Sequence, residues 1–194
     1  MTISAALRIA DTASLAAGAM LLNGCIPLAV TGVAATASIA TDRRTAGTQV
    51  DDEIIEDKAA AQINERYKDT AHVNVTSYNG LVLLTGEATT EAARTDIAKI
   101  ALSMPKARTV QNELVVGPPT GMGARTNDTV ITSKVKTRFV EASKFQINYV
   151  KVVTEREVVY LMGIVRREEG EAAGQIASTT SGVQRVVKVF EYLN

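Results

Sequence analysis

The feature that most constrains the fold of this 194-residue chain is an internal repeat. Residues 73–75 and 81–86 (Val-Asn-Val and Leu-Val-Leu-Leu-Thr-Gly) match residues 150–152 and 158–163 (Val-Lys-Val and Val-Val-Tyr-Leu-Met-Gly). The first valine and the glycine are 13 residues apart in both copies, and the copies are offset by 77 residues. Upstream the offset is 76, so a single-residue length change relates the copies. Repetition at an almost constant offset predicts two units with the same fold.

Each copy begins with the pattern of an amphipathic helix. Apolar residues recur every four positions, which places them on one face of a helix. These residues are Ile55, Ala59 and Ile63 in the first copy, and Ile131, Val135 and Phe139 in the second. At the start of the second of these helices, Asp128 or Thr129 can act as the N-cap by accepting hydrogen bonds from free backbone amides.

A β-hairpin follows the helix in each copy. In the first copy, alternating apolar residues flank Asn79-Gly80, and these two residues readily adopt the positive φ angles of a tight turn. The second copy has Glu155-Arg156 at this place, which predicts a looser loop.

The order of elements in each unit is αββαβ. A second helix and a last strand are predicted at residues 90–102 and 109–116 of the first copy, and at residues 168–179 and 183–193 of the second. Two helices on one face of a three-stranded mixed sheet are the simplest way to bury both apolar faces. The predicted fold class is therefore α+β, with two tandem αββαβ domains. Since each unit has only a small core, we expect the two to dock and stabilise each other.

Five segments follow from these patterns. They are a leader at residues 1–24, a tether at 25–50, a first domain at 51–117, a linker at 118–124 and a second domain at 125–194.

The leader ends in a motif for lipid attachment. Residues 13–22 form a ten-residue run that is apolar except for Ser14, which suits a signal peptide and is too short to span a bilayer. The run ends at residues 22–25 (Leu-Asn-Gly-Cys), which resemble a bacterial lipobox. The resemblance implies cleavage before Cys25 and acylation of its thiol. Because residue 26 is Ile rather than Asp, resemblance to enterobacterial lipoproteins also implies export to the outer membrane.

Composition argues against several kinds of protein. Equal numbers of basic and acidic residues, 21 of each, argue against a dedicated nucleic-acid binder. The single histidine, His72, argues against a histidine-rich metal site and against Ser-His-Asp chemistry. We therefore expect a protein that does not bind nucleic acid, has no metal or cofactor, and has too few candidate bases for a hydrolase.

The two domains differ in charge. Residues 51–117 contain 7 basic and 11 acidic side chains, a net charge of −4. Residues 125–194 contain 11 basic and 8 acidic side chains, a net charge of +3. Opposite signs predict that the two domains have different partners.

Both repeats resemble the BON domain (bacterial OsmY and nodulation). The resemblance rests on the Val-x-Val strand, the Asn-Gly turn, the strand ends at Gly86 and Gly163, and residues 182–186 before the last strand. A lipobox followed by two such units resembles the dual BON-domain outer-membrane lipoproteins over residues 22–194. That resemblance implies a non-enzymatic periplasmic protein that binds anionic phospholipid through its second domain. It also implies a role in envelope integrity, with enrichment at division sites.

The resemblance places the lipid contact on the first helix of the second domain. On this helix the periodicity puts Val130 on the exposed side, beside Lys134 and Thr137, and puts Arg138 at the edge of the core. The candidate phospholipid-binding residues are Thr129, Val130, Ser133, Lys134, Thr137 and Arg138. The dual BON-domain lipoproteins that this chain resembles carry a Trp at the position of Val130. Since Trp favours the bilayer interface more than Val does, lipid binding here is either weaker or more dependent on charge.

A second hypothesis is a periplasmic adaptor that binds envelope proteins. Its partners would belong to outer-membrane assembly or peptidoglycan machinery, and its acyl anchor would be its only lipid contact. Sedimentation of the soluble chain with liposomes separates this hypothesis from phospholipid binding. Under either hypothesis we expect a lipid-anchored monomer on the periplasmic side of the outer membrane.

Overall fold

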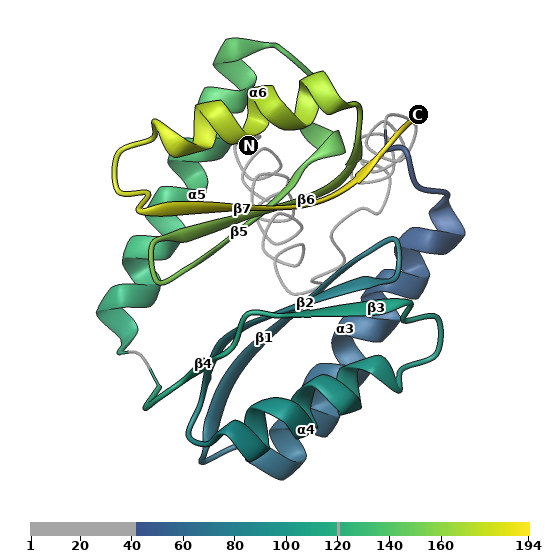
Figure 1. Ribbon diagram of the computed structural model, residues 1–194, viewed down its shortest axis with the longest axis vertical. Coiled ribbons are helices and arrows are strands. Elements are labelled where there is room, and N and C mark those ends of the chain that lie inside the picture. The colour runs from purple at the N-terminus through teal and green to yellow at the C-terminus, as the bar shows by residue number, and fades with distance from the viewer. Residues whose placement is uncertain (1–41, 120) are drawn as a thin grey trace, which may run out of the picture. The chain divides into compact units, whose positions relative to one another are not determined.

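Two mixed sheets, each covered by two helices, make up the part of the chain that the structure describes (Figure 1). The computed structural model describes residues 42–119 and 121–194, which belong to one compact unit. The leader, Cys25 and most of the predicted tether lie outside the described residues. Within the described ranges, every helix is too short or too polar to span a bilayer.

The first repeat contains two helices and four strands. Its elements are α3 (Ala46–Tyr67), β1 (Ala71–Tyr78), β2 (Leu81–Ala88), α4 (Glu91–Leu102), β3 (Thr109–Asn112) and β4 (Val115–Val116). Strand β2 pairs antiparallel with β1 and parallel with both β3 and β4.

The second repeat follows the same order. Its elements are α5 (Met122–Ala142), a short 3-10 helix η1 (Ile147–Tyr149), β5 (Lys151–Glu155), β6 (Val158–Val165), α6 (Arg167–Ser178) and β7 (Arg185–Tyr192). Strand β6 pairs antiparallel with β5 and parallel with β7. The predicted α+β class and the αββαβ order of both repeats are confirmed.

The first helix of each repeat begins earlier than the sequence predicted. Helix α3 starts at Ala46, inside the predicted tether, where the Thr45 hydroxyl accepts a hydrogen bond from the Thr48 amide. Helix α5 starts at Met122, so the prediction that Asp128 or Thr129 caps it is wrong. Apolar periodicity marks only the buried part of a helix, and the first buried residues here are Asp52 and Asp128. The exposed turns before them therefore left no apolar signal.

The last strand of the first repeat is interrupted, although the sequence predicted one continuous strand over residues 109–116. Between β3 and β4 the chain turns inward and buries Leu114 in the core. The Leu114 amide donates to the Asn112 side-chain oxygen at 3.2 Å. Because Leu114 is buried in the core, residues 113 and 114 leave the register that β3 and β4 keep with β2.

The hairpin of the second repeat is tight, so the looser loop predicted there is wrong. Strands β5 and β6 are joined by Arg156-Glu157, whose φ angles are 52° and 63°. Asn79 and Gly80 have nearly the same angles, 53° and 74°, in the first repeat. Neither Arg nor Glu favours such angles by itself, so other contacts must hold this turn.

Each repeat has its own core between its sheet and its helices. In the first repeat the core includes Ile55, Ala59, Ile63, Val82, Leu84 and Ile97. In the second it includes Ile131, Val135, Phe139, Val159, Leu161 and Ala173. Since every second residue of a strand faces the same side, the remaining side chains of β2 and β6 point away from these helices.

A third apolar cluster joins the two repeats. It is formed by Tyr78 and Leu83 from the first repeat, and by Tyr160 and Met162 from the second. Leu83 and Tyr160 occupy equivalent positions in the repeat, 77 residues apart. Full burial of a side chain of this size contributes about 1.5–3 kcal/mol, so the cluster stabilises the pair of domains. The predicted docking of the two units is confirmed.

Candidate functional site

All six residues predicted to contact phospholipid lie around one shallow hollow on α5. The hollow has a volume of about 490 Å³. It is lined by Thr129, Val130, Ser133, Lys134, Thr137 and Arg138, together with Glu141, Thr180 and Ser181. The last two residues follow α6, so the hollow lies where the loop after α6 passes beside α5. The six residues chosen from the helix pattern therefore lie together around one hollow in the structure.

Val130 is the exposed apolar side chain of this hollow. It is 46% exposed, whereas Ile131 and Val135 of the same helix are buried in the core. The hydroxyls of Thr129 and Ser133 donate to the backbone carbonyls of Arg125 and Thr129, each at 3.0 Å. A hydroxyl that donates to a backbone carbonyl of its own helix already has an acceptor for its proton, so it forms fewer hydrogen bonds with water. This face of α5 is consequently less polar than its composition indicates.

Charge in the hollow comes from Lys134, Arg138 and Glu141. No hydrogen bond or ion pair of the Lys134 ammonium is seen in the described part of the chain, which leaves this cation available to a ligand. Arg138 has a different role, since its guanidinium donates to the Ile176 carbonyl at 2.9 Å and to the Thr180 hydroxyl at 2.8 Å. Arg138 therefore joins the C-terminal end of α6 to α5, a role that the sequence did not predict.

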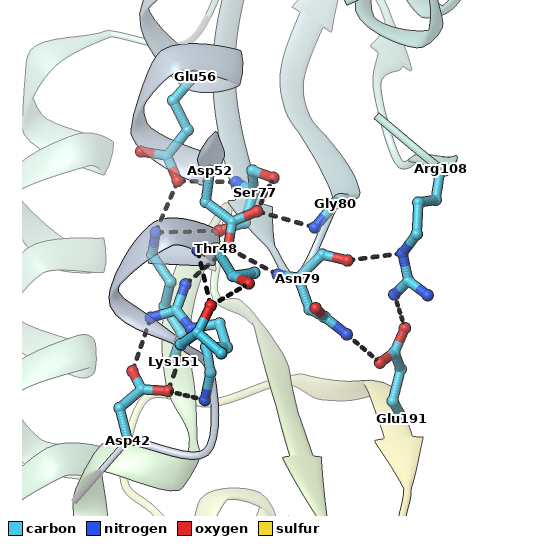
Figure 2. A network of polar contacts seen from close by, with 12 residues as sticks. Asp42, Thr48, Asp52, Glu56, Ser77, Asn79, Gly80, Arg108, Lys151 and Glu191 are labelled. Carbon is cyan, nitrogen blue, oxygen red and sulfur yellow. Dashed lines mark hydrogen bonds and ion pairs between the residues drawn. The ribbon is translucent and has the colours of Figure 1, made fainter. Parts of the chain in front are cut away.

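A buried aspartate organises the first repeat, and Figure 2 shows its contacts. The Asp52 carboxylate accepts hydrogen bonds from the Ser77 hydroxyl at 2.6 Å and from the backbone amides of Asn79 and Gly80 at 2.7 and 2.8 Å. It also accepts one from the Arg44 guanidinium at 2.8 Å. Asp52 thereby connects α3 to the β1–β2 turn.

Asp128 has the equivalent role in the second repeat. Its two carboxylate oxygens accept from the backbone amides of Arg156 and Glu157, both at 2.8 Å. These two bonds hold the β5–β6 turn in its positive-φ geometry and explain why the loop is tight without glycine. The sequence contained a signal for this pair, because Asp52 and Asp128 are separated by the repeat offset of 76. That signal indicates a shared structural role.

Hydrogen bonding sets the charge state of Asp52. Burial raises the pKa of this carboxyl group, but the hydrogen bonds from Ser77, Gly80, Arg44 and Asn79 outweigh that effect. The pKa of Asp52 is consequently lower than the ordinary value for aspartate. The carboxylate is therefore ionised at neutral pH, and its charge is balanced by Arg44.

The two αββαβ repeats correspond to a known class of domain. The sequence profile of the BON domain matches residues 51–118 and 127–194. The chain belongs to the BON domain family and carries two copies of the domain.

Individual relatives extend this similarity beyond the domains. The chain is 35% identical over 196 residues to the outer membrane lipoprotein DolP of Haemophilus influenzae, with 100% of both chains covered. It is also 35% identical over 154 residues to a 21 kDa hemolysin of Actinobacillus pleuropneumoniae, covering 78% of this chain and 79% of that one. Neither name is that of an enzyme. The whole-chain similarity supports an outer-membrane lipoprotein with two BON domains.

Solved structures add little. CdsD, a structural protein of the type III secretion system of Chlamydia trachomatis, matches with a TM-score of 0.30 and 12% identity. The match covers 73% of this chain and 63% of that one. A TM-score this low supports no argument about this chain.

Proposed function

We propose that this chain is a lipid-anchored protein of the outer membrane, and that the exposed face of α5 contacts anionic phospholipid from the periplasmic side. The protein then has two attachments to the membrane, the acylated Cys25 and the second BON domain. It is not an enzyme, and it contributes to envelope integrity at division sites by binding the lipid surface.

One observation supports the lipid contact: an exposed valine lies beside a lysine that pairs with no other group in residues 42–119 and 121–194, and both line one hollow. Val130 and Lys134 are four residues apart on α5 and line the same hollow. An apolar side chain can enter the headgroup region while the adjacent ammonium remains near lipid phosphate. The net charge of +3 of residues 125–194 favours an anionic surface, whereas the net charge of −4 of residues 51–117 opposes it.

Cys25→Ala tests the anchor. We expect the variant to be released from the membrane fraction, because a thiol is the only side chain here that can form the thioether to a diacylglycerol. The measurement is fractionation of cell envelopes at high salt, where electrostatic attraction between α5 and anionic lipid is screened. If the variant remains with the outer membrane at high salt, the assignment of the anchor to Cys25 is incorrect.

Substitutions on α5 test the lipid contact separately from the anchor. The protein used is the chain from residue 26 onward, which contains all of the described residues, 42–119 and 121–194. Lys134→Glu should weaken its binding to phosphatidylglycerol vesicles by roughly tenfold or more, because each lysine near an anionic surface contributes about 1 kcal/mol. Val130→Trp should strengthen binding, since an indole suits the interface. Sedimentation with vesicles at two salt concentrations measures both effects.

The repeat supplies a matched control. Lys58 occupies the position in α3 that Lys134 occupies in α5, and it is also exposed. Lys58→Glu makes the same change of charge in the other domain and should leave binding nearly unchanged. Circular dichroism verifies that all three variants are folded. Equal weakening by Lys58→Glu and Lys134→Glu would show an effect of overall charge alone. If neither Lys134→Glu nor Val130→Trp alters binding, the protein-binding adaptor becomes the better hypothesis.

A further inference from the structure

Two consecutive arginines before α3 reach into different repeats. The Arg43 guanidinium donates to both carboxylate oxygens of Glu169, at 2.7 and 2.8 Å, and to the Ile164 carbonyl at 2.8 Å. It also lies over the Tyr149 ring, 3.7 Å from the centroid. All of these contacts are in the second repeat, although Arg43 is joined by the chain to the first.

Arg44 makes the same kind of contact within the first repeat. Its guanidinium donates to Asp52 and to Asp42, both at 2.8 Å, and lies over the Tyr78 ring, 3.9 Å from the centroid. Each arginine therefore forms an ion pair with a carboxylate and also lies over a tyrosine ring. Arg43 does so in the second repeat, and Arg44 does so in the first. Figure 2 labels Asp42 and Asp52, the two carboxylates that accept hydrogen bonds from Arg44.

The geometry makes the Arg43 contact strong for an ion pair outside the core. When a planar guanidinium donates two parallel hydrogen bonds to one carboxylate, the two bonds fix the relative orientation of the two groups. The side chains of Arg43 and Glu169 are only 17% and 10% exposed, so water screens them little. Glu169 also accepts from the Arg166 amide at 2.7 Å at the start of α6, which fixes the carboxylate that Arg43 meets.

Other polar contacts also join the repeats, among them the hydrogen bonds from the side-chain amide of Asn74 to Glu155 at 2.7 Å and from that of Asn79 to Glu191 at 2.6 Å. Arg108–Glu191 and Lys151–Glu56 are ion pairs between the repeats, and at least one side chain of each is more than a third exposed. Pairs as exposed as these contribute little. The apolar cluster of Tyr78, Leu83, Tyr160 and Met162 stabilises the interface, but hydrophobic contact is non-directional and does not fix the orientation of the repeats.

We propose that residues 42–44 form a clasp that closes the interface between the two BON domains, through Arg43 on Glu169 and Arg44 on Asp52. The clasp immediately follows the segment that leads from Cys25. Its release lets the repeats separate while each keeps its own core, and this separation exposes the apolar faces of both sheets. The proposal does not depend on lipid binding by α5.

Thiol labelling measures such separation directly. Met162 is 0% exposed and belongs to the cluster between the repeats, whereas Val135 is 0% exposed within the core of the second repeat. Met162→Cys in a chain with Cys25→Ser places the only thiol at the interface. Val135→Cys in the same background places it in the core. A buried thiol reacts only when its site opens, so the two rates distinguish separation of the repeats from unfolding of one repeat.

Arg43→Ala should increase the labelling rate of the interface thiol about tenfold or more, because charged hydrogen bonds in a partly buried site are lost. Glu169→Gln, which keeps an acceptor for the Arg166 amide, should give a similar increase. In the double variant the interface thiol should be labelled hardly faster than in either single variant, because both substitutions remove the same interaction. The core thiol should react as slowly as in the parent chain.

Arg66→Ala is the control, because Arg66 pairs with Asp96 inside the first repeat at 2.9 Å. It should leave the interface thiol at the parent rate. An unchanged rate for the interface thiol in both Arg43→Ala and Glu169→Gln would overturn the proposal. Equal acceleration of the core thiol would overturn it too, since the arginine would then support folding of the second repeat rather than closure between repeats.

Discussion

Asp52→Ala should lower the free energy of unfolding by about 3–5 kcal/mol, the range for removing one partner of a buried ion pair. The substitution leaves the Arg44 guanidinium without one of its carboxylates and the amides of Asn79 and Gly80 without their acceptor. Buried donors without a partner incur the full cost of their lost hydration. Urea denaturation of the soluble chain, followed by circular dichroism, measures the loss.

Asp57→Ala is the matched control, since Asp57 lies on the exposed face of the same helix. It should alter stability by no more than about 0.5 kcal/mol. Comparable losses in the two variants would contradict the role assigned to Asp52.

Acid denaturation tests the same carboxylate by another route. Because the pKa of Asp52 is lower in the folded protein, the ionised group stabilises the fold. This contribution is complete above the unfolded-state pKa of about 3.9 and is lost as the pH falls through the folded-state pKa. Asp52→Asn should therefore flatten the fall in stability over this acidic range. A variant with the same acid dependence as the parent chain would show that the pKa shift is absent.

Gly86→Ala and Gly163→Ala should each cost about 4 kcal/mol or more, or prevent accumulation of folded protein. A Cβ atom at Gly86 would lie 2.1 Å from the His72 carbonyl oxygen, and one at Gly163 would lie 2.1 Å from the Tyr149 carbonyl oxygen. The His72 carbonyl belongs to β1, which cannot move aside without breaking its pairing with β2. The Tyr149 carbonyl ends the 3-10 helix η1, two residues before β5 begins, so it is also held in place by the backbone around it. Gly86 also has a φ of +110°, which alanine rarely adopts.

Gly117→Ala supplies the comparison, because nothing lies within 4 Å of the Cβ position there. Thermal unfolding of the soluble fractions measures all three variants. We expect Gly117→Ala to unfold within a few degrees of the parent chain, since a small change in free energy shifts the midpoint only slightly. A folded Gly163→Ala protein with the parent's midpoint would show that the sheet can accept a side chain at this place.

Isolated domains are less suitable for testing how the two repeats divide their roles. Separating the repeats would expose Tyr78 and Leu83 on one domain, and Tyr160 and Met162 on the other. An exposed apolar surface of this kind favours self-association and binds vesicles regardless of charge. Single substitutions in the joined domains, such as Lys134→Glu and Lys58→Glu, avoid this difficulty.

Periodic and repeated features of the chain could be predicted from the sequence. The stripe of Ile131, Val135 and Phe139 predicted the buried side of α5, and by exclusion the exposed side with Val130. The repeat offset predicted two copies of one αββαβ unit, and the structure confirms both. These features depend on residues close in sequence, whose spacing follows from the geometry of helices and strands.

Long-range contacts were decided by the tertiary structure alone. The turn at Arg156-Glu157 looked unfavourable from its own residues. Both of its backbone amides donate hydrogen bonds to the carboxylate of Asp128 on α5, and these two bonds make the turn tight. Arg138 was placed at the edge of the core, and only the position of α6 gave it the Ile176 carbonyl as a partner. Arg43 and Glu169 are 126 residues apart. The sequence determined which faces are apolar and the order of the helices and strands, although not where the first helix of each repeat begins. Which carboxylate meets which amide or guanidinium depends on how the elements pack, because such contacts join residues that no local periodicity relates.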